Sequence, residues 1–448
     1  MNSRRIVLSA LGVVVAWWGG VVAIWAPTTS LAQEREPTDL AAAIDRHATA
    51  VEGRVIAWRR DIHQNPELGN REFRTADLVA RHLRSLGLEV QTGVAHTGVV
   101  ALLRGEHAGP VVALRADMDA LPVTEEVDLP FASKVTTTYD GNEVGVMHAC
   151  GHDAHTAILM GVAEILAALK PQLPGTVKFI FQPAEEGPPA GEEGGAALMI
   201  KQGVLENPKP EAIFGLHVIS GLEVGKITYR PGPLMASADV LRIGVRGRQT
   251  HGAMPWRGID PIVAAAQIVL GLQTIPSRQL DIMKEPAIVS IGSIHGGVRS
   301  NIIPDTVEMV GTIRAFDEEM RADIHARVKT TAEMIARSAG ATAEVAIDTL
   351  VPVTVNHPDL TEQMVPTLIA VAGGENVFIG PKMTASEDFS YYQQHLPGFF
   401  FFIGITPRGT ESGHAAPNHS PRFYVDESGL LLGVRALAHL AVAYMQAS

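Results

Sequence analysis

The chain has one cysteine, Cys150, among its 448 residues. A single cysteine excludes a disulfide within the chain, so the fold is held together without covalent cross-links. An unpaired thiol in an exported protein is a reactive liability unless it is buried or bound to a metal. The lack of a partner thiol therefore makes the surroundings of Cys150 the first place to look for chemistry.

Aromatic residues are also scarce, at 5% of the chain, and basic residues are fewer than acidic ones, at 36 against 48. Three of the five tryptophans, Trp17, Trp18 and Trp25, lie within the first 32 residues. Nucleic-acid binding needs a basic surface and aromatic side chains on which bases stack. These scarcities exclude nucleic acid as the expected partner. The sequence also lacks internal repeats and low-complexity tracts.

The first 32 residues contain no acidic side chain. They carry Arg4 and Arg5, run apolar from residue 6 to residue 26 and end in SLA, which is the pattern of a cleaved export signal. The arginine pair resembles a twin-arginine signal, which suits a protein that folds before export. The apolar run is nearly long enough to span a bilayer, so an uncleaved membrane anchor is the alternative. We expect a periplasmic or secreted protein.

Hydrophobic residues make up 46% of the chain and charged residues 19%, so the protein can bury a sizeable core, and we expect two domains. Two helices are predicted over residues 40–86, with a break at Asn65 and Pro66. Short apolar runs then alternate with an amphipathic stretch at 154–169, and these runs lie at 98–103, 111–116, 177–181 and 213–218. This alternation predicts an α/β domain whose mostly parallel sheet has helices on both faces and its site at the carboxyl ends of the strands.

The pattern changes near residue 238 to strand, helix, two strands, helix and strand, which is the ferredoxin-like order. The predicted helices lie at 261–272 and 318–338, and two of the strands lie at 287–294 and 306–316. We therefore predict an inserted α+β domain at 236–348, and a first domain built from residues 38–235 and 349–448. The run of four phenylalanines at 399–402 is interpreted as a buried strand of the first domain rather than an aromatic pocket.

Cys150 lies in the segment MHACGHDAHT, residues 147–156, which places His152 two positions after it. Thiolate, imidazole and carboxylate are the side chains that bind first-row transition metals. A lone cysteine more often packs as a small hydrophobe, however, and a lone histidine is more often structural. The metal hypothesis therefore depends on further donors from elsewhere in the chain.

Further donors follow the predicted strands, and they are Asp117, Asp119, Glu185, Glu186, His217 and, near the end of the chain, His419. Each of these residues alone is weak evidence for a metal site, because acidic pairs usually lie in solvated turns. Their joint position at the strand ends of one sheet predicts a metal site. One of two adjacent glutamates can bind metal while the other takes a proton from water and passes it to a leaving amine. The pattern therefore predicts metal-assisted amide hydrolysis.

Four motifs of the sequence resemble those of a known family. The motifs RADMDALP (115–122), HACGHDAH (148–155), QPAEEG (182–187) and SEDF (386–389) resemble, in this order, those of the aminoacylase and glutamate-carboxypeptidase-like metallopeptidases. Within that family they match the amidohydrolase subfamily of hippurate hydrolases, N-acyl-amino-acid hydrolases and plant auxin-conjugate hydrolases. The resemblance implies a two-metal enzyme that hydrolyses N-acyl amino acids to a carboxylic acid and a free amino acid. A dipeptidase or carboxypeptidase of the same family, and a non-catalytic binding protein on this fold, are the alternatives.

The resemblance also implies roles for individual residues. Two divalent ions, manganese, zinc or cobalt, would be held by Cys150, His152, Glu186, His217 and His419. Cys150 would bridge them, Glu185 would act as general base and acid, and Asp119 would orient a ligand imidazole. His148, Asp153 and His155 are left outside this set. Relatives outside the subfamily carry a histidine where this chain has Asp117, and a bridging carboxylate in place of the cysteine. This difference leaves the identity of the metal undetermined.

The inserted domain is implied to be a lid and dimerisation domain, so a homodimer or larger homo-oligomer is expected. Its motifs RQTHGAMP (248–255) and RSNIIPD (299–305) imply that His251, in relatives often from the partner subunit, stabilises an oxyanion and that Asn301 contacts the substrate. A structural turn is the alternative for both. Arg314 is a candidate partner for a substrate carboxylate, with a solvated strand arginine as the alternative.

Overall fold

A computed structural model describes residues 39–447 of the chain. The predicted export signal, with Arg4 and Arg5, lies outside the described residues. The description begins in helix α1 (Asp39–Gln64), which is followed by helix α2 (Phe73–Ser85). Pro66 lies between them, as expected for a residue that lacks the backbone donor a helix needs. The first turn of α2 is capped by the Glu67 carboxylate, which accepts hydrogen bonds from the backbone of Arg74 and Thr75, each at 2.9 Å.

The central sheet of the larger domain has eight strands in the order β1-β2-β6-β3-β7-β18-β8-β17. Its inner strands β6, β3, β7 and β18 are parallel to one another, whereas β1 and β2 run antiparallel at one edge. The predicted mostly parallel sheet is confirmed at its centre. The strand bounds are β1 (Glu89–Val94), β2 (Gly98–Arg104), β3 (His107–Asp117), β6 (Pro174–Gln182), β7 (Ala212–Glu223), β8 (Ile227–Tyr229), β17 (Val377–Ile379) and β18 (Gly398–Thr406).

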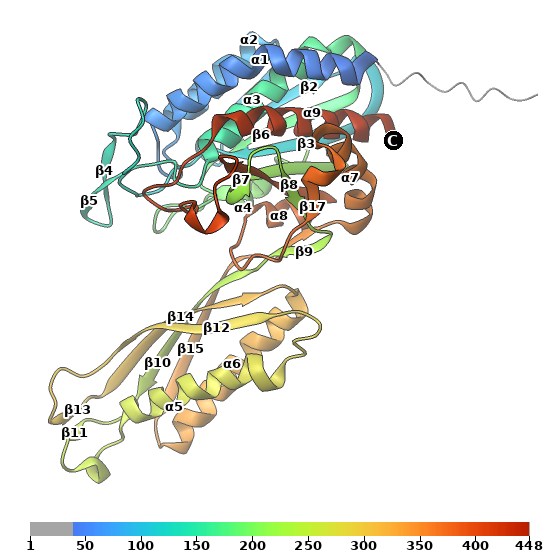
Figure 1. The fold of residues 1–448 in the computed structure, drawn as a ribbon. Helices are drawn as coiled ribbons and strands as arrows, with labels where there is room; N and C mark the ends of the chain where they lie inside the picture. The colour runs from blue at the N-terminus through green and yellow to red at the C-terminus, as the bar shows by residue number, and fades with distance from the viewer. Residues whose placement is uncertain (1–38, 448) are drawn as a thin grey trace, which may run out of the picture. The chain divides into compact units, whose positions relative to one another are not determined.

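Helices cover both faces of this sheet (Figure 1). One face carries α1, α2, α3 (His152–Ala168), α7 (Pro358–Ala372) and α9 (Leu430–Ala447), and the other carries α4 (Gly195–Lys201) and α8 (Phe389–Gln393). All nine residues of β18 are buried, and alternate side chains enter alternate cores: Phe399 and Phe401 pack on one face, Phe400 and Phe402 on the other. The predicted buried strand at 399–402 is confirmed.

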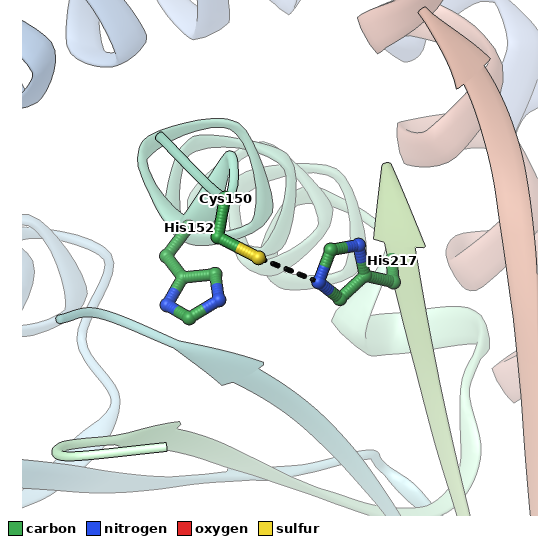
Figure 2. A group of neighbouring side chains, drawn as sticks. All are labelled: Cys150, His152 and His217. Atoms are coloured by element: carbon green, nitrogen blue, oxygen red, sulfur yellow. Dashed lines mark hydrogen bonds between the residues drawn. The ribbon is translucent and has the colours of Figure 1, made fainter. Parts of the chain in front are cut away.

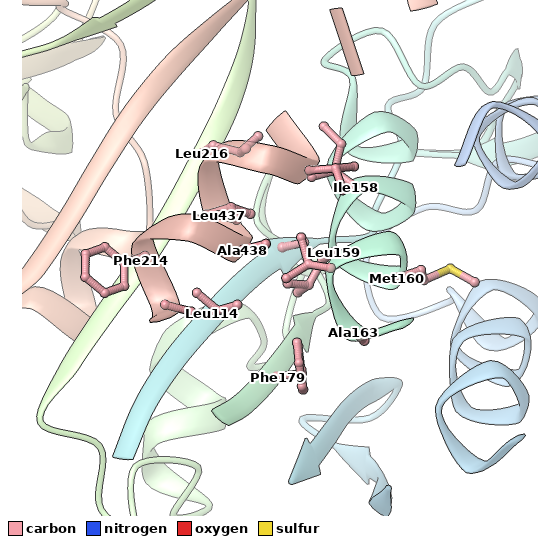
Figure 3. Packing of buried hydrophobic residues seen from close by; sticks show 14 of the residues in the cluster. Leu114, Ile158, Leu159, Met160, Ala163, Phe179, Phe214, Leu216, Leu437 and Ala438 are labelled. Carbon is pink, nitrogen blue, oxygen red and sulfur yellow. The ribbon is translucent and has the colours of Figure 1, made fainter. Parts of the chain in front are cut away.

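Helix α3 is buried on nearly all sides, so its amphipathic interpretation was wrong. The helix contacts β3 and β7 of the sheet as well as α2 and α9. Figure 3 shows Ile158 and Leu159 of α3 beside Leu437 of α9 and Leu114 of β3. The segment Glu427–Ala447, which contains α9, has the length and composition of a membrane span, but 67% of its apolar window is buried within the protein, as expected for a core helix.

The second domain has the ferredoxin-like order that the sequence predicted. Its elements are β10 (Ala238–Arg246), α5 (Pro261–Thr274), β12 (Ala287–His295), β14 (Thr306–Ala315), α6 (Glu318–Ser338) and β15 (Thr342–Val351). The four strands pair in the order β12-β14-β10-β15, all antiparallel, and α5 and α6 share an apolar core with this sheet. Both helices begin at an aspartate cap, Asp260 and Asp317. β15 continues to Val351, beyond the predicted limit of residue 348.

Shorter pairs of strands complete the fold. They are β4 (Thr136–Tyr139) with β5 (Asn142–Gly145), β9 (Gly232–Met235) with β16 (Thr354–Asn356), and β11 (Thr250–His251) with β13 (Ile302–Ile303). One predicted strand end was wrong, because β7 continues past His217 to Glu223. Pairing with β18 supports this extension, whereas pairing with β3 stops at Gly215. His217 therefore lies where β7 separates from β3 and one side of the strand becomes free for a site.

Candidate metal centre

The start of helix α3 fixes Cys150 and His152 on either side of Gly151. Gly151 has a φ of 96°, and a Cβ atom at this position would lie 2.2 Å from a side-chain carbon of Val218, so only glycine fits this turn. The turn brings Cys150 and His152 toward β7. Figure 2 shows Cys150 between His152 and His217, and its Sγ atom lies 3.3 Å from His217 Nε2.

A second group of donors contacts Cys150 from the other side. His419 Nε2 lies 3.2 Å from Cys150 Sγ and 3.0 Å from Glu186 Oε1. Two groups therefore have Cys150 in common: one with His152 and His217, the other with Glu186 and His419. Within each group the potential ligand atoms lie within 4.8 Å of one another. The structure thus brings together all five residues that were predicted as metal ligands.

The hydrogen bonding of these donors fits a bound cation. His152 Nδ1 is paired with Asp119 Oδ1 at 3.1 Å, and His217 Nδ1 with its neighbouring carbonyl at 2.6 Å. The opposite atom, His152 Nε2, is buried without a hydrogen-bond partner among the described residues, and Glu186 Oε1 has only the close contact with His419. Buried polar atoms normally have partners, and metal-binding imidazoles are oriented through their second nitrogen. The residues present therefore fit metal ions.

The site also buries more carboxyl groups than the single arginine among them, Arg115, can neutralise. The carboxylates are Asp117, Asp119, Glu185, Glu186, Glu387 and Asp388. Arg115 is fully buried among them and contacts Asp117, Glu387 and Asp388 at 2.6, 3.0 and 2.8 Å. Burial would lower the pKa of His152, but the Asp117 and Asp119 carboxylates outweigh burial and raise it to about 10. A site that favours positive charge so strongly suits a divalent cation.

Glu185 lies beside the donors without being part of either group that contains Cys150. Its Oε2 atom is 3.9 Å from His152 Nε2, and its Oε1 atom accepts a hydrogen bond from the backbone of Asp388 at 3.3 Å. Burial raises the pKa of the Glu185 carboxyl well above its ordinary value, and the Glu387 and Glu186 carboxylates raise it further. Nearby cations favour the ionised form, so bound metal ions would return this carboxyl to a proton-accepting state.

Glu185, Cys150 and His419 line a cavity of about 900 Å³. Arg314, on β14, lines the same cavity and is half-buried. Its Nη1 atom donates to Ser386 Oγ at 3.3 Å, and no carboxylate among the described residues forms an ion pair with it. Burial lowers the pKa of Arg314, which reflects the cost of a cation with little compensation. An anionic group in the cavity would supply the missing charge.

His251 and Asn301 lie together but do not line this cavity. His251, on β11, is exposed, and its Nδ1 atom accepts a hydrogen bond from the backbone of Ala253 at 3.0 Å. The carbonyl of Asn301 accepts from the backbone of Gly252 at 2.8 Å. The two residues therefore lie on one surface of the inserted domain. Because they do not line the cavity of their own chain, their predicted roles require the cavity of another chain.

The histidines and the aspartate left outside the ligand set either form other polar contacts or, in the case of His148, make no hydrogen bond among the described residues. His155 uses both ring nitrogens, with Asp117 Oδ1 at 2.6 Å and the Val218 backbone at 2.8 Å. Asp153 pairs with Arg59 and His63, each at 2.8 Å. His148 is fully buried, both its ring nitrogens lack partners among the described residues, and burial lowers its pKa to about 3.

Arg115 and Glu387, to which the sequence assigned no role, contact each other beside Glu185. Both lie inside the motifs RADMDALP and SEDF. The sequence did contain a signal for this contact, because residues of opposite charge in two motifs that follow strands can form a buried ion pair. Their mutual pairing, however, joins segments more than 250 residues apart, and only the folded topology determines it.

Comparison with known proteins identifies relatives along nearly the whole chain. The sequence pattern of peptidase family M20/M25/M40 matches residues 113–443, a range that contains all five candidate ligands. Thermostable carboxypeptidase 2 of Saccharolobus solfataricus is 41% identical over 91% of this chain and 99% of its own length. N-acetylcysteine deacetylase of Bacillus subtilis is 40% identical over 88% of this chain and 97% of its own length.

A solved structure extends the comparison to three dimensions. The crystal structure of a dinuclear metal-binding peptidase of the M20 family from Bacillus subtilis matches this fold with a TM-score of 0.73 at 37% identity. The match covers 89% of this chain and 99% of that one. The similarity therefore includes both the large sheet and the inserted domain.

Proposed function

Because the chain belongs to peptidase family M20/M25/M40 and is a metal-dependent hydrolase, we propose that it cleaves the amide bond of N-acyl amino acids. The products would be a carboxylic acid and a free amino acid. One observation carries the proposal: two groups of metal-binding side chains have Cys150 in common beside Glu185, in a cavity that also contains Arg314, which forms no ion pair among the described residues. Metal donors, a proton carrier and an anion-binding cation are the parts that such a hydrolysis requires.

Five residues would hold two divalent ions, manganese, zinc or cobalt, and these are Cys150, His152, Glu186, His217 and His419. Bound ions of this kind polarise a carbonyl and lower the pKa of water. Asp119 would keep His152 oriented through the contact at Nδ1. Glu185 would take a proton from the attacking water and give it to the nitrogen of the departing amino acid.

The substrate carboxylate would pair with Arg314, which lies in the cavity without an acidic partner among the described residues. His251 and Asn301 would reach the cavity of a second subunit, where His251 stabilises the developing oxyanion. This assignment makes the enzyme a homodimer or larger homo-oligomer. The exposed position of His251 supports the proposal. A catalytic histidine that does not line the cavity of its own chain can act only in the cavity of another chain.

A carboxypeptidase or dipeptidase is the second candidate, favoured by the relative that is named a carboxypeptidase and is 41% identical. The same residues would serve both reactions, because a peptide bond and an N-acyl bond are both amides next to an amino acid carboxylate. The difference lies in the group on the acyl side, which carries an amine in a dipeptide. No residue contact in the cavity separates the two candidates.

The N-terminal pattern supports a further proposal, that the protein is exported to the periplasm or beyond, with residues 1–32 removed or kept as an anchor. Mass spectrometry of the protein purified from its producing cell would measure the mature N-terminus. A chain that begins at Gln33 is expected, and an intact N-terminus in a soluble cell fraction would contradict export.

The function is tested by loading residues 33–448 with Mn²⁺ and measuring the release of glycine from N-benzoylglycine. Parent protein is expected to release it, and Glu185→Gln is expected to lower kcat by about 100-fold or more while the metal content stays unchanged. The glutamine keeps the size of the side chain but cannot accept the proton. Undiminished turnover in this variant would remove Glu185 from the mechanism.

A further inference from the structure

The turn that presents Glu185 and Glu186 contains an unusual backbone conformation. Ala184, the residue before them, is buried and has a φ of 51°. This left-handed region is unfavourable for a residue with a Cβ atom, and such residues persist only where their surroundings hold them. The two glutamates that the proposed reaction needs therefore follow directly on a strained residue.

The Glu72 side chain, at the residue just before α2, contacts this turn. Its Oε1 atom accepts a hydrogen bond from the Ala184 backbone at 2.8 Å, and its Oε2 atom accepts one from the Thr97 hydroxyl. The side chain is fully buried. Burial and the nearby Asp119 carboxylate raise the pKa of the Glu72 carboxyl to about 8, and its hydrogen bonds with Thr97 and the Ala184 backbone offset this only in part. Glu72 is therefore committed to the turn and to Thr97.

Glu72 is not required by its own helix. It occupies the position before the first residue of α2, where Ser, Thr, Asp or Asn usually caps the helix, and its side chain makes no capping hydrogen bond. Glu67 caps the helix instead, through the backbone of Arg74 and Thr75. The chain thus has two glutamates at one helix end, one for the helix and one for the turn before Glu185.

A second carboxylate fixes the other side of Glu185. Asp119 Oδ2 accepts a hydrogen bond from the Glu186 backbone at 3.0 Å, while its other oxygen pairs with His152. The backbone donors on both sides of Glu185 are therefore held by buried carboxylates, Glu72 before it and Asp119 after it. Gly69 permits this close packing, because a Cβ there would lie 2.8 Å from the Gly187 carbonyl oxygen.

We propose that Glu72 is a positioning residue, which holds Ala184 in its left-handed conformation and so directs Glu185 and Glu186 toward the metal centre. The inference rests on the proposed function, since it assigns those two glutamates their roles. It adds a residue that touches neither metal nor substrate and that lies before the region matched by the family pattern. Its effect reaches the reaction through the backbone of one turn.

Glu72→Ala tests the proposal in the metal-loaded protein. It is expected to lower kcat by about 10- to 100-fold, because small displacements of catalytic groups have effects of that size. The KM for N-benzoylglycine is expected to change less than about threefold, and Mn²⁺ binding is expected to weaken by about tenfold through displacement of Glu186. Unchanged kcat and unchanged Mn²⁺ affinity in the folded variant would overturn the proposal.

Glu72→Gln is the conservative variant. Its amide oxygen can still accept from Ala184, and the Thr97 hydroxyl can turn to accept from the new amide group. We expect kcat within about threefold of the parent, given that both hydrogen bonds can be kept. A loss in Glu72→Gln as large as that in Glu72→Ala would contradict positioning through these two bonds.

Glu67→Ala is the matched control, because it removes a carboxylate of the same helix end that serves α2 alone. It is expected to lower the denaturation midpoint without lowering kcat per folded protein. In the double variant Glu72→Ala with Ala184→Gly, glycine adopts a positive φ at little cost, so part of the lost kcat is expected to return. Equal kcat losses in Glu67→Ala and Glu72→Ala would indicate a merely structural role and overturn the proposal.

A readout without substrate separates this inference from the proposed function. Hydrogen exchange at residues 184–186 of the metal-free protein is expected to be faster in Glu72→Ala than in the parent and in Glu67→Ala. Should the parent hydrolyse no N-acyl amino acid, the proposed function fails, and exchange together with Mn²⁺ affinity still decides the role of Glu72. Exchange rates equal to those of the parent would contradict it.

Discussion

Cys150 is the residue on which both donor groups depend, since its Sγ atom lies within 3.3 Å of His217 and 3.2 Å of His419. Burial raises the pKa of its thiol well above the ordinary value, and the Glu186 and Glu185 carboxylates raise it further. A thiolate here is therefore costly without nearby cations, and bound metal ions supply the compensating charge. Thiol ionisation and metal binding are expected to occur together at this residue.

Cys150→Ser is predicted to lower metal occupancy. A serine hydroxyl ionises far less readily than a thiol and is a poorer ligand for manganese, zinc or cobalt in a bridging position. We expect fewer than two ions per chain after dialysis against metal-free buffer, with the folded state retained. Elemental analysis measures the ratio, and full occupancy in the variant would rule out Cys150 as a ligand.

Arg314→Met is predicted to act on the substrate carboxylate. Loss of one charged hydrogen-bond partner costs about 1.5 to 3 kcal/mol, so the KM for an N-acyl amino acid should rise by about 10- to 100-fold. The corresponding N-acyl amino acid amide, which lacks the carboxylate, provides the control, and its hydrolysis should be nearly equal in the two proteins. An equal loss on both substrates would show that Arg314 does not bind the carboxylate.

At the scale of elements, helix α6 is attached to the sheet of the inserted domain by a buried ion pair. Arg321 of α6 contacts Asp239 of β10 through two nitrogens, at 2.5 and 3.1 Å, and His325 contacts the same carboxylate at 2.7 Å. Burial alone would raise the pKa of Asp239, but the hydrogen bonds from His325 and Arg321 outweigh it and lower the pKa. The pair therefore gives the inserted domain a stability that depends on pH.

Asp239→Asn is predicted to destabilise the protein by up to about 3 kcal/mol near neutral pH, since it removes the buried carboxylate of Arg321 and leaves only the partly exposed Glu318, at 3.1 Å, as its acidic partner. The folded pKa is lowered, so the contribution is complete above the ordinary carboxyl pKa of about 4 and is lost as the pH falls through the lowered value. The difference in Tm between parent and variant should therefore shrink as the pH falls below about 4. A difference that stays constant from pH 7 to pH 3 would contradict this account.

The elements that the sequence predicted well have strong local signals. Helix α6 begins and ends at the predicted residues, Glu318 and Ser338, because Asp317 caps it and its apolar spacing is regular. Strand β18 was recognised from four consecutive apolar residues. Strand β1 was missed because it lies at the sheet edge, where five of its six residues are exposed or half-buried and no apolar alternation appears.

The site was predictable in its residue types but not in its contacts. The five candidate ligands and Glu185 stood out as chemistry-bearing residues in short motifs, and Asp119 was placed beside a ligand imidazole. Glu72 was not recognised, because its contact with Ala184 joins residues 112 positions apart and depends on a positive φ that no residue type announces. Long-range pairing between buried charges needs the folded topology.

At the scale of the whole molecule, the inserted domain exposes several large apolar side chains. On α5, the side chains of Ile262, Val263 and Leu270 are 45%, 53% and 71% exposed. Val298, three residues after the end of β12, is 97% exposed. β12 is also the edge strand of its sheet. Exposed apolar groups beside an open sheet edge mark an association surface, which supports the proposed homodimer.

Leu270→Glu is predicted to disrupt that dimer, because association would bury the new charge among apolar side chains. Light scattering should give twice the mass of one chain for the parent and the mass of one chain for the variant. Turnover should fall with dissociation if His251 serves the partner subunit. A monomeric parent with full activity would contradict both the dimer and the role of His251 in a second cavity.

The central claim is that the metal-loaded protein hydrolyses the amide of N-acyl amino acids. The most direct measurement is kcat/KM for N-acetyl-, N-benzoyl- and indoleacetyl-amino acids compared with dipeptides that have the same carboxyl-terminal residues. At least one N-acyl amino acid is expected to be hydrolysed more efficiently than its matching dipeptide. Cleavage of dipeptides alone would contradict the claim and identify a dipeptidase.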